Sequence, residues 1–162
     1  MCLLLGHVHS ILLSKYFKGI LLAGLGRMGQ SHASNLVHSI PEAEVVAVCS
    51  IVQEELDWAK KNLGIQDLYQ DFDKMVDEKK GEADAVYLVT STDQHARGII
   101  KGLENGLHVF CEKPLGISIK ECLEVEEVSK KHPELNVTLG FVRRYDPSYK
   151  YAKELVDSGK IG

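Results

Sequence analysis

Short apolar runs alternate with segments of helical periodicity over most of this chain. The runs are rich in Val, Ile and Leu, as is typical of strands buried on both faces, and are expected at 18–23, 44–50, 84–90, 107–111 and 136–141. Mixed polar and apolar stretches predict helices at 27–38, 54–63, 71–79, 93–105, 118–131 and 148–158. This alternation predicts an α/β fold with a doubly wound parallel sheet, covered by helices on both faces.

Residues that start and end helices support these boundaries. Gly64 and Gly106 stand where two of the helices should end. The segment Ser118–Glu121 has the spacing of a capping box, in which the two side chains satisfy each other's backbone N–H groups. Asp146–Pro147 provides an N-cap and a proline suited to the first helical position, and Gly159 marks the end of that last helix.

The first strand runs into a G-x-G-x-x-G turn made by Gly24, Gly26 and Gly29, and a helix follows. This order is that of the dinucleotide-binding turn of a Rossmann fold. Gly24 permits the tight turn, Gly26 lets a pyrophosphate approach the backbone, and Gly29 lets the helix pack closely on the sheet. The helix N-terminus directs N–H groups at the phosphates. We expect these glycines, with Arg27 and Met28 between them, to bind a dinucleotide; the alternative is a simple glycine-rich turn.

Composition excludes several classes of protein. The chain has 162 residues, of which 44% are hydrophobic and 26% charged, and its formal net charge is −4. This balance predicts a globular protein with no nucleic-acid partner. The four cysteines lack metal-type spacing, which predicts free thiols, no bound metal and a cytoplasmic location. The apolar stretch at 1–14 is too short to span a bilayer, so no membrane partner is expected. Residues 1–16 are interpreted as an extension and 17–142 as the dinucleotide-binding domain.

The residue after the second strand bears on the choice between NAD and NADP. In NAD-binding domains an acid here binds the ribose 2′-hydroxyl. Ser50 is neutral, its hydroxyl is able to donate to a 2′-phosphate, and Arg27 would add a cation nearby. We therefore predict NAD or NADP as the cofactor, with NADP at least equal to NAD, unless Ser50 is only a turn residue. Glu54 and Glu55 are expected to point away on the next helix.

Hydroxyl side chains gather after the strand at 84–90. Thr90, Ser91 and Thr92 are expected beside the cofactor, Thr90 and Ser91 foremost, because helix capping would account for one of the three. His95 lies about one turn into the following helix. Its position near a strand end favours a cofactor-side role, and a packed histidine is the alternative.

A charged pair and two arginines follow the last strands. The segment Glu112–Pro114 comes directly after a buried strand, and its proline ends that strand. Lys113 at this edge can donate to a substrate hydroxyl and stabilise a developing alkoxide, the alternative being an exposed turn. Arg143 and Arg144 suit a hydroxyl-rich or anionic ligand, or equally an ion pair with Asp146.

Together these motifs resemble those of the Gfo/Idh/MocA oxidoreductases. The resemblance runs from about residue 17 onward and rests on the glycine turn, Thr90-x-x-x-x-His95, Glu112-Lys113-Pro114 and Gly140-Phe-x-Arg-Arg-x-Asp-Pro147. Within the family, the stretches at 110–116 and 143–149 are most similar to inositol 2-dehydrogenases. The family transfers a hydride reversibly between nicotinamide and a carbon of a sugar or polyol. The resemblance therefore implies an NAD(P)-dependent oxidoreductase with a small polyol or sugar substrate.

The resemblance also implies roles for single residues. Lys113 matches the catalytic lysine that touches both cofactor and substrate hydroxyl, and Arg143 matches an arginine of the substrate pocket. Ser50, Ser91 and Thr92 depart from the acid, proline and asparagine frequent in the family. The residues that match cofactor-binding positions are Gly24, Gly26, Gly29, Ser50, Thr90, Ser91, Thr92, His95 and Glu112.

Family members continue into a second α/β domain, which supplies an Asp and a His for substrate binding and proton transfer. Residues 143–162 match only the start of that domain, so the second domain is expected to be missing. Hydride transfer from a hydroxyl needs a base, and we therefore expect cofactor binding with very slow or no polyol turnover. The alternative function is a non-catalytic or regulatory nucleotide-binding module. The apolar residues Tyr149, Ala152, Leu155 and Val156 of the last helix are expected to be exposed or paired with another molecule, which predicts self-association or poor solubility.

Overall fold

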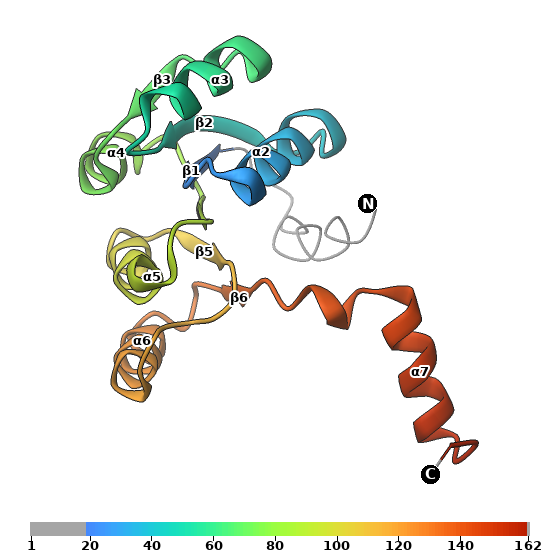
Figure 1. Cartoon of the computed structure of the whole chain (residues 1–162). Helices are drawn as coiled ribbons and strands as arrows, with labels where there is room; N and C mark the ends of the chain where they lie inside the picture. The colour runs from blue at the N-terminus through green and yellow to red at the C-terminus, as the bar shows by residue number, and fades with distance from the viewer. Residues whose placement is uncertain (1–18, 162) are drawn as a thin grey trace.

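A six-stranded parallel sheet forms the centre of the computed structural model, which describes residues 19–161. Its strands are β1 (Gly19–Ala23), β2 (Glu44–Cys49), β3 (Asp67–Tyr69), β4 (Ala85–Leu88), β5 (His108–Cys111) and β6 (Val137–Leu139). They lie in the order β3-β2-β1-β4-β5-β6, and every neighbouring pair is parallel (Figure 1). The chain winds outward from β1 to β3 and then returns to β4 on the other side of β1. This reversal is the switch point of a doubly wound sheet.

Helices cover both faces of the sheet (Figure 1). On one face lie α2 (Arg27–Ser39) and α3 (Gln53–Leu63), and on the other lie α4 (Phe72–Lys79), α5 (His95–Glu104) and α6 (Ile119–Lys131). Alternate residues of β1 serve the two cores, since Ile20 and Leu22 pack under α2 and α3 whereas Leu21 and Ala23 pack under the other helices. Burial of both faces is why the central strands are continuously apolar.

The predicted α/β fold with a parallel doubly wound sheet is confirmed. One strand was not predicted: β3 (Asp67–Tyr69) is three residues long, lies at the sheet edge and is only half-buried. Its single aliphatic side chain, Leu68, leaves too little pattern to indicate a strand. The extension expected at 1–16 lies outside the described residues.

Helix ends follow the local signals. The backbone of Gly64 and Gly106 is left-handed, with φ of 73° and 76°. In the predicted capping box, Ser118 Oγ accepts from the backbone N–H of Glu121 at 3.2 Å and the Glu121 carboxylate accepts from that of Ser118 at 3.3 Å. The helix expected at 93–105 is divided, because the short 3₁₀ turn η1 (Thr92–Gln94) precedes α5.

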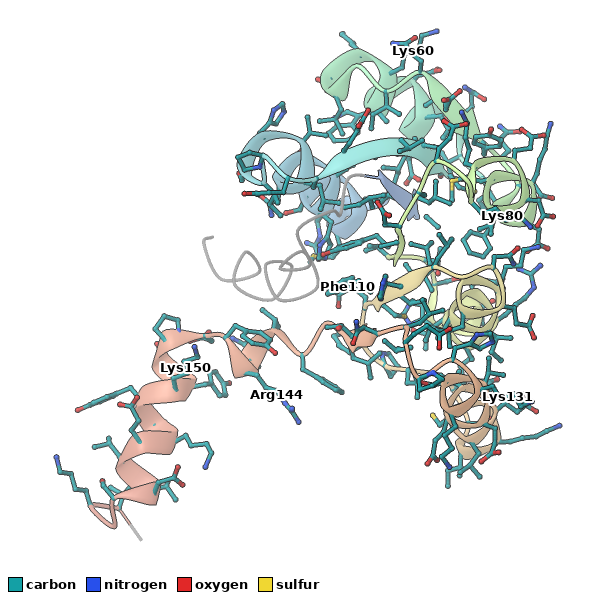
Figure 2. All side chains as sticks on the ribbon, turned by 180° about the vertical axis from the view of Figure 1, so that it is seen from behind. Lys60, Lys80, Phe110, Lys131, Arg144 and Lys150 are labelled. Atoms are coloured by element: carbon teal, nitrogen blue, oxygen red, sulfur yellow. The ribbon has the colours of Figure 1, made fainter. Side chains whose placement is uncertain are left out.

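The last helix, α7 (Pro147–Asp157), stands away from the sheet beyond the 3₁₀ turn η2 (Val142–Arg144) (Figure 1). Figure 2 shows Arg144 and Lys150 on this projecting segment and Phe110 within the sheet domain. No residue of α7 is buried, and Tyr149 and Val156 are each 54% exposed. Of the four apolar residues expected to be exposed or paired with another molecule, Tyr149, Ala152 and Val156 are exposed and Leu155 is half-buried. Within residues 19–161, no helix combines the length and apolarity needed to cross a membrane.

Candidate functional site: a cleft at the switch point

A cleft of about 770 Å³ opens at the carboxyl edge of the sheet, where the strand order reverses. The ends of β1, β2 and β4 form its floor, and the beginnings of α3, α4 and α5 form its walls. Ligands of doubly wound folds bind at this place. The lining residues are Ala23–Gly26, Cys49–Val52, Glu55, Gln70–Asp73, Leu88–Ser91, Asp93, Gln94, Arg97 and Gly98.

The glycine turn is held between β2 and β4. Gly24 has a left-handed backbone with φ of 92°, and its N–H donates to the carbonyl of Cys49 at 2.8 Å. A Cβ on Gly24 would lie 2.4 Å from the carbonyl oxygen of Val89. Both the backbone conformation and the close contact therefore require glycine here.

The other two glycines differ in what surrounds them. A Cβ on Gly29 would lie 1.9 Å from the carbonyl oxygen of Gly24, so this glycine lets α2 close onto the turn. A Cβ on Gly26 would meet only Glu55 Oε1, at 3.9 Å, and would otherwise point into open space. Gly26 is the N-cap of α2 and has no side chain to cap the first N–H groups. The space above Gly26 and these uncapped donors fit a pyrophosphate.

A second observation supports the fit to a nucleotide. Thr90 Oγ1 is buried at the cleft and has no hydrogen-bond partner among residues 19–161. Such orphaned polar atoms are uncommon in folded proteins and call for an explanation such as a bound ligand. Ser91 also lines the cleft, whereas Thr92 does not. The structure thus brings two of the three predicted hydroxyl residues to the cleft wall.

Ser50 and Glu55 form the side of the cleft next to β2. Ser50 is 6% exposed, and its Oγ accepts from the N–H of Val52 at 3.1 Å and donates to Glu55 Oε2 at 2.5 Å. The expectation that Glu55 points away is therefore wrong: its carboxylate turns back onto the strand end and lines the cleft. Glu54, the preceding residue, is exposed and is not among the lining residues, as expected.

Arg27 and Met28 lie on the first turn of α2. Both are exposed, and neither is among the residues that line the cleft. Their predicted contact with a cofactor stays a prediction. The only basic side chain among the described lining residues is that of Arg97, which forms an ion pair with Asp73.

His95 is buried behind the cleft, with 2% of its surface exposed. Its Nδ1 lies 2.7 Å from the carbonyl oxygen of Pro114, and its Nε2 lies 3.1 Å from that of Thr90. The structure therefore gives this ring backbone partners on both sides. His95 joins the segments that follow β4 and β5, and is thus the packed histidine of the alternative interpretation.

Glu112 and Lys113 stand at the end of β5, beside the segment that follows β4. The N–H of Glu112 donates to the carbonyl of Leu88 at 2.9 Å, which fixes the pair next to the cleft edge. Lys113 is exposed, and the Lys113–Pro114 peptide bond is cis. Neither charged side chain lines the cleft itself. The pair extends the site along the sheet edge, from β4 toward β5.

A buried histidine that sequence reasoning missed holds Glu112 in place. His32 of α2 is 3% exposed, and its Nε2 lies 3.0 Å from Glu112 Oε1. The ring packs edge-on against Tyr87 and beside Phe110. The available signal was its spacing, since a residue three positions after Gly29 lies on the same, inward face of the helix.

Gly140, which follows β6, lies close to the same carboxylate. A Cβ on Gly140 would lie 3.0 Å from the carboxylate of Glu112. The N–H of Gly140 donates to the carbonyl of Cys111 at 2.8 Å, which keeps the two strands in register. The glycine thus leaves room for Glu112 between His32 and β6.

The charge of Glu112 is stabilised in the fold. Burial raises the pKa of this carboxyl, but the hydrogen bond and charge of His32, the backbone N–H of Lys113 and the Lys113 charge outweigh it, so that the pKa falls below its ordinary value of 4.5. Glu112 is therefore an ionised acceptor at neutral pH, suited to orient a donor at the cleft edge.

Replacing Glu112 by Gln should lower the free energy of unfolding by about 1–2 kcal/mol at pH 7, because a hydrogen bond to a charged group is lost. Since folding lowers this pKa, the stabilisation is complete above pH 4.5 and is lost as the pH falls through the lower pKa of the folded state. The difference from wild type should therefore shrink below pH 4.5. Urea unfolding at several pH values measures this difference in the free energy of unfolding.

The control is Glu42→Gln, at an exposed carboxylate in a turn, which should change the free energy of unfolding little. A difference between Glu112→Gln and wild type that does not depend on pH would contradict the lowered pKa of Glu112.

Arg143 has local partners. Its Nη1 lies 3.2 Å from Asp146 Oδ2, and its guanidinium lies over the Tyr149 ring, 5.0 Å from the centroid. The ion pair with Asp146, named as an alternative, is therefore present. Arg144 lies over the ring of Phe141 at 5.4 Å. The proposed contact of Arg143 with a substrate remains a prediction.

The cysteines within residues 19–161 are free thiols. Burial, with a smaller contribution from Asp71, raises the pKa of Cys49 to about 11. Burial, with a smaller contribution from Glu112, raises that of Cys111 to about 12. Both thiols are therefore protonated at neutral pH and are poor nucleophiles, although Cys49 lines the cleft.

Known proteins are similar to this chain in sequence. Residues 18–141 match the model of the GFO_IDH_MocA family, described as an oxidoreductase family with an NAD-binding Rossmann fold. The scyllo-inositol 2-dehydrogenase (NAD(+)) of Bacillus subtilis (strain 168) is 40% identical over 141 residues, which are 86% of this chain and 40% of that protein. The myo-inositol 2-dehydrogenase of Thermotoga maritima is 35% identical over 139 residues, again 86% of this chain and 40% of that protein.

Solved structures agree with these matches. The crystal structure of scyllo-inositol dehydrogenase from Lactobacillus casei with bound NAD(H) and scyllo-inositol is 45% identical, with a TM-score of 0.84. The similarity covers 91% of this chain and 43% of that one. The chain therefore spans about two fifths of the length of these relatives. The predicted resemblance and the prediction of NAD or NADP as cofactor are confirmed. The family match and the glycine turn at the switch point together show that this chain belongs to the Gfo/Idh/MocA family of NAD-binding oxidoreductases.

Proposed function

We propose that this chain binds NAD(H) in the cleft and provides the cofactor side of a hydride transfer to or from a hydroxyl-bearing carbon of an inositol-type polyol. One observation carries the proposal: three features lie side by side at one edge of the sheet, because β1, β4 and β5 are neighbours. They are the glycine turn after β1, the unpaired Thr90 hydroxyl after β4 and the Glu112–Lys113 pair after β5. The similarity to inositol dehydrogenases supports the class of substrate.

Each group on this edge has a chemical task. Gly26 and the N-terminus of α2 hold the pyrophosphate, as their open space and uncapped N–H groups allow. Thr90 donates to or accepts from the bound dinucleotide through its unpaired hydroxyl. Glu112, ionised and fixed by His32, accepts from a donor on the nicotinamide side. The nicotinamide, when bound, supplies the hydride chemistry.

Lys113 is the residue that we place at the reacting hydroxyl. Its ammonium group carries only donors, so it can bond to a hydroxyl oxygen and stabilise the negative charge that develops as the proton leaves. Lys113 is exposed at the end of β5, and none of the ion pairs found among residues 19–161 uses it. It is therefore available to a substrate that approaches this edge.

Titration of the purified protein with NADH, followed by calorimetry, tests the first part of the proposal. We expect saturable binding with one site per chain. A flat titration with both NADH and NADPH, on protein shown to be folded by circular dichroism, would overturn it.

Replacing Lys113 by Met tests the second part. Because Lys113 is placed at the substrate rather than in the cleft, NADH affinity should change less than about 3-fold, while any inositol-dependent NAD⁺ reduction should fall by at least about 100-fold. Product is measured by mass spectrometry, which detects slow turnover. Lys120→Met, at an exposed lysine on α6, is the control. Equal turnover by wild type and the Lys113 variant would exclude the role of Lys113. A wild type that binds NADH without any inositol oxidation would confine the function to cofactor binding.

A further inference from the structure

We propose that Glu55 takes the place of the missing acid at the end of β2, binds the adenosine ribose and makes the chain selective for NAD(H) over NADP(H). This inference rests on the proposed binding of a dinucleotide in the cleft. It reverses the sequence-based expectation that NADP is at least equal to NAD, which followed from the neutral Ser50.

The hydroxyl of Ser50 is already committed. A serine has one O–H donor, and that of Ser50 is directed at Glu55 Oε2 at 2.5 Å. Its oxygen also accepts from the N–H of Val52 at 3.1 Å. Ser50 therefore has no hydrogen left to donate to a 2′-phosphate, which was the basis for favouring NADP. Its function in this structure is to hold a carboxylate at the strand end.

Glu55 stands between the end of β2 and the glycine turn. It is in the first turn of α3, and the chain reverses so tightly after β2 that its side chain reaches back to Ser50. Oε1, the other carboxylate oxygen, lies 3.9 Å from the position of a Cβ on Gly26, and no partner within residues 19–161 occupies it. In a Rossmann fold the adenosine ribose lies between these two segments, and an acid there accepts from its 2′-hydroxyl. Glu55 offers that acceptor from five residues further along the chain.

The remaining charges of the cleft also favour NAD(H) over NADP(H). The described lining residues include one basic side chain, Arg97, and it is paired with Asp73. The lining acids are Glu55, Asp71, Asp73 and Asp93. A 2′-phosphate would bring about −1.5 to −2 charges at neutral pH and, when fully ionised, no hydrogen to donate. It would therefore meet a carboxylate in a negatively charged cleft, whereas a ribose hydroxyl would donate to it.

Affinity measurements on the purified chain test this assignment. Calorimetry with NADH and with NADPH gives the ratio of the two dissociation constants, which requires no turnover. In wild type, we expect NADPH to bind at least about 10-fold more weakly than NADH. Glu55→Gln retains the size and a hydrogen-bonding side chain but removes the charge. The ratio should then fall to about 3-fold or less, chiefly through tighter NADPH binding. The control is Glu54→Gln, an identical change of charge on the neighbouring, exposed residue of α3, and it should leave the ratio unchanged.

A rescue distinguishes recognition from a general effect on folding. Adding Ser50→Asp to Glu55→Gln puts an acid at the end of β2, and selectivity for NADH should return to at least about 10-fold. Equal NADH and NADPH affinities in wild type, or a ratio that Glu55→Gln leaves unchanged, would overturn the proposal. An effect of Glu54→Gln as large as that of Glu55→Gln would also overturn it, because net charge alone would then explain the result. If neither nucleotide binds to the folded wild type, the proposed function itself is wrong.

Discussion

Gly26→Ala should weaken NADH binding by at least about 10-fold, equivalent to about 1.4 kcal/mol, while the protein remains folded. The added methyl group would point into the cleft, where only Glu55 Oε1 lies within 4 Å. It would therefore occupy ligand space without clashing with the protein. The backbone of Gly26, with φ of −61°, is accessible to alanine, and the poorer N-cap should cost less than about 1 kcal/mol.

Calorimetric titration with NADH measures the loss of affinity. Urea unfolding measures whether the variant remains stably folded. Gly81→Ala is the matched control, because a Cβ there meets nothing within 4 Å and Gly81 lies far from the glycine turn in the sequence. It should leave both NADH affinity and stability close to wild type. If Gly26→Ala bound NADH as tightly as Gly81→Ala, the pyrophosphate would not lie against this turn.

Gly29→Ala, in contrast, should destabilise the fold. We expect its free energy of unfolding to fall by about 3 kcal/mol or more. Its Cβ would lie 1.9 Å from the carbonyl oxygen of Gly24 and 2.7 Å from the carbonyl carbon. These are backbone atoms of a turn that is hydrogen-bonded to β2, so they cannot move aside as a flexible side chain would. Helix α2 must shift from the sheet, and the buried contacts of Leu36 and Ala33 are weakened with it.

Urea unfolding of Gly29→Ala beside Gly81→Ala measures this loss. The Gly81 control carries the same change in composition without a close contact, and any difference between the two variants reports the packing of α2 on the turn. A Gly29 variant within about 0.5 kcal/mol of the control would show that the turn relaxes and that the close approach is not required.

The contrast between these glycines explains why the turn could be predicted from the sequence. The role of each glycine depends on backbone geometry within a single strand–turn–helix unit, and the spacing of the three residues records that geometry. The topology was predictable for a related reason, since continuous apolar strands separated by helices leave few arrangements other than a doubly wound sheet. Helix ends marked by Gly64 and the Ser118–Glu121 capping box are equally local.

Contacts between separate elements could not be predicted in this way. His32 and Glu112 are 80 residues apart and meet only because α2 packs on the sheet with the His32 ring against Tyr87 and Phe110. Glu55 is close to Ser50 in sequence, but its direction depends on the tight reversal between β2 and α3, which periodicity does not describe. The sequence therefore predicted which residue types stand at the strand ends, whereas their partners required the packing of the helices.

The two carbonyl contacts of His95 have a mechanical consequence. The ring lies between the backbone carbonyl of Thr90, after β4, and that of Pro114, after β5, and so connects the two segments. We therefore expect substitution of His95 to loosen the segment that carries Lys113 as well as the segment that carries Thr90.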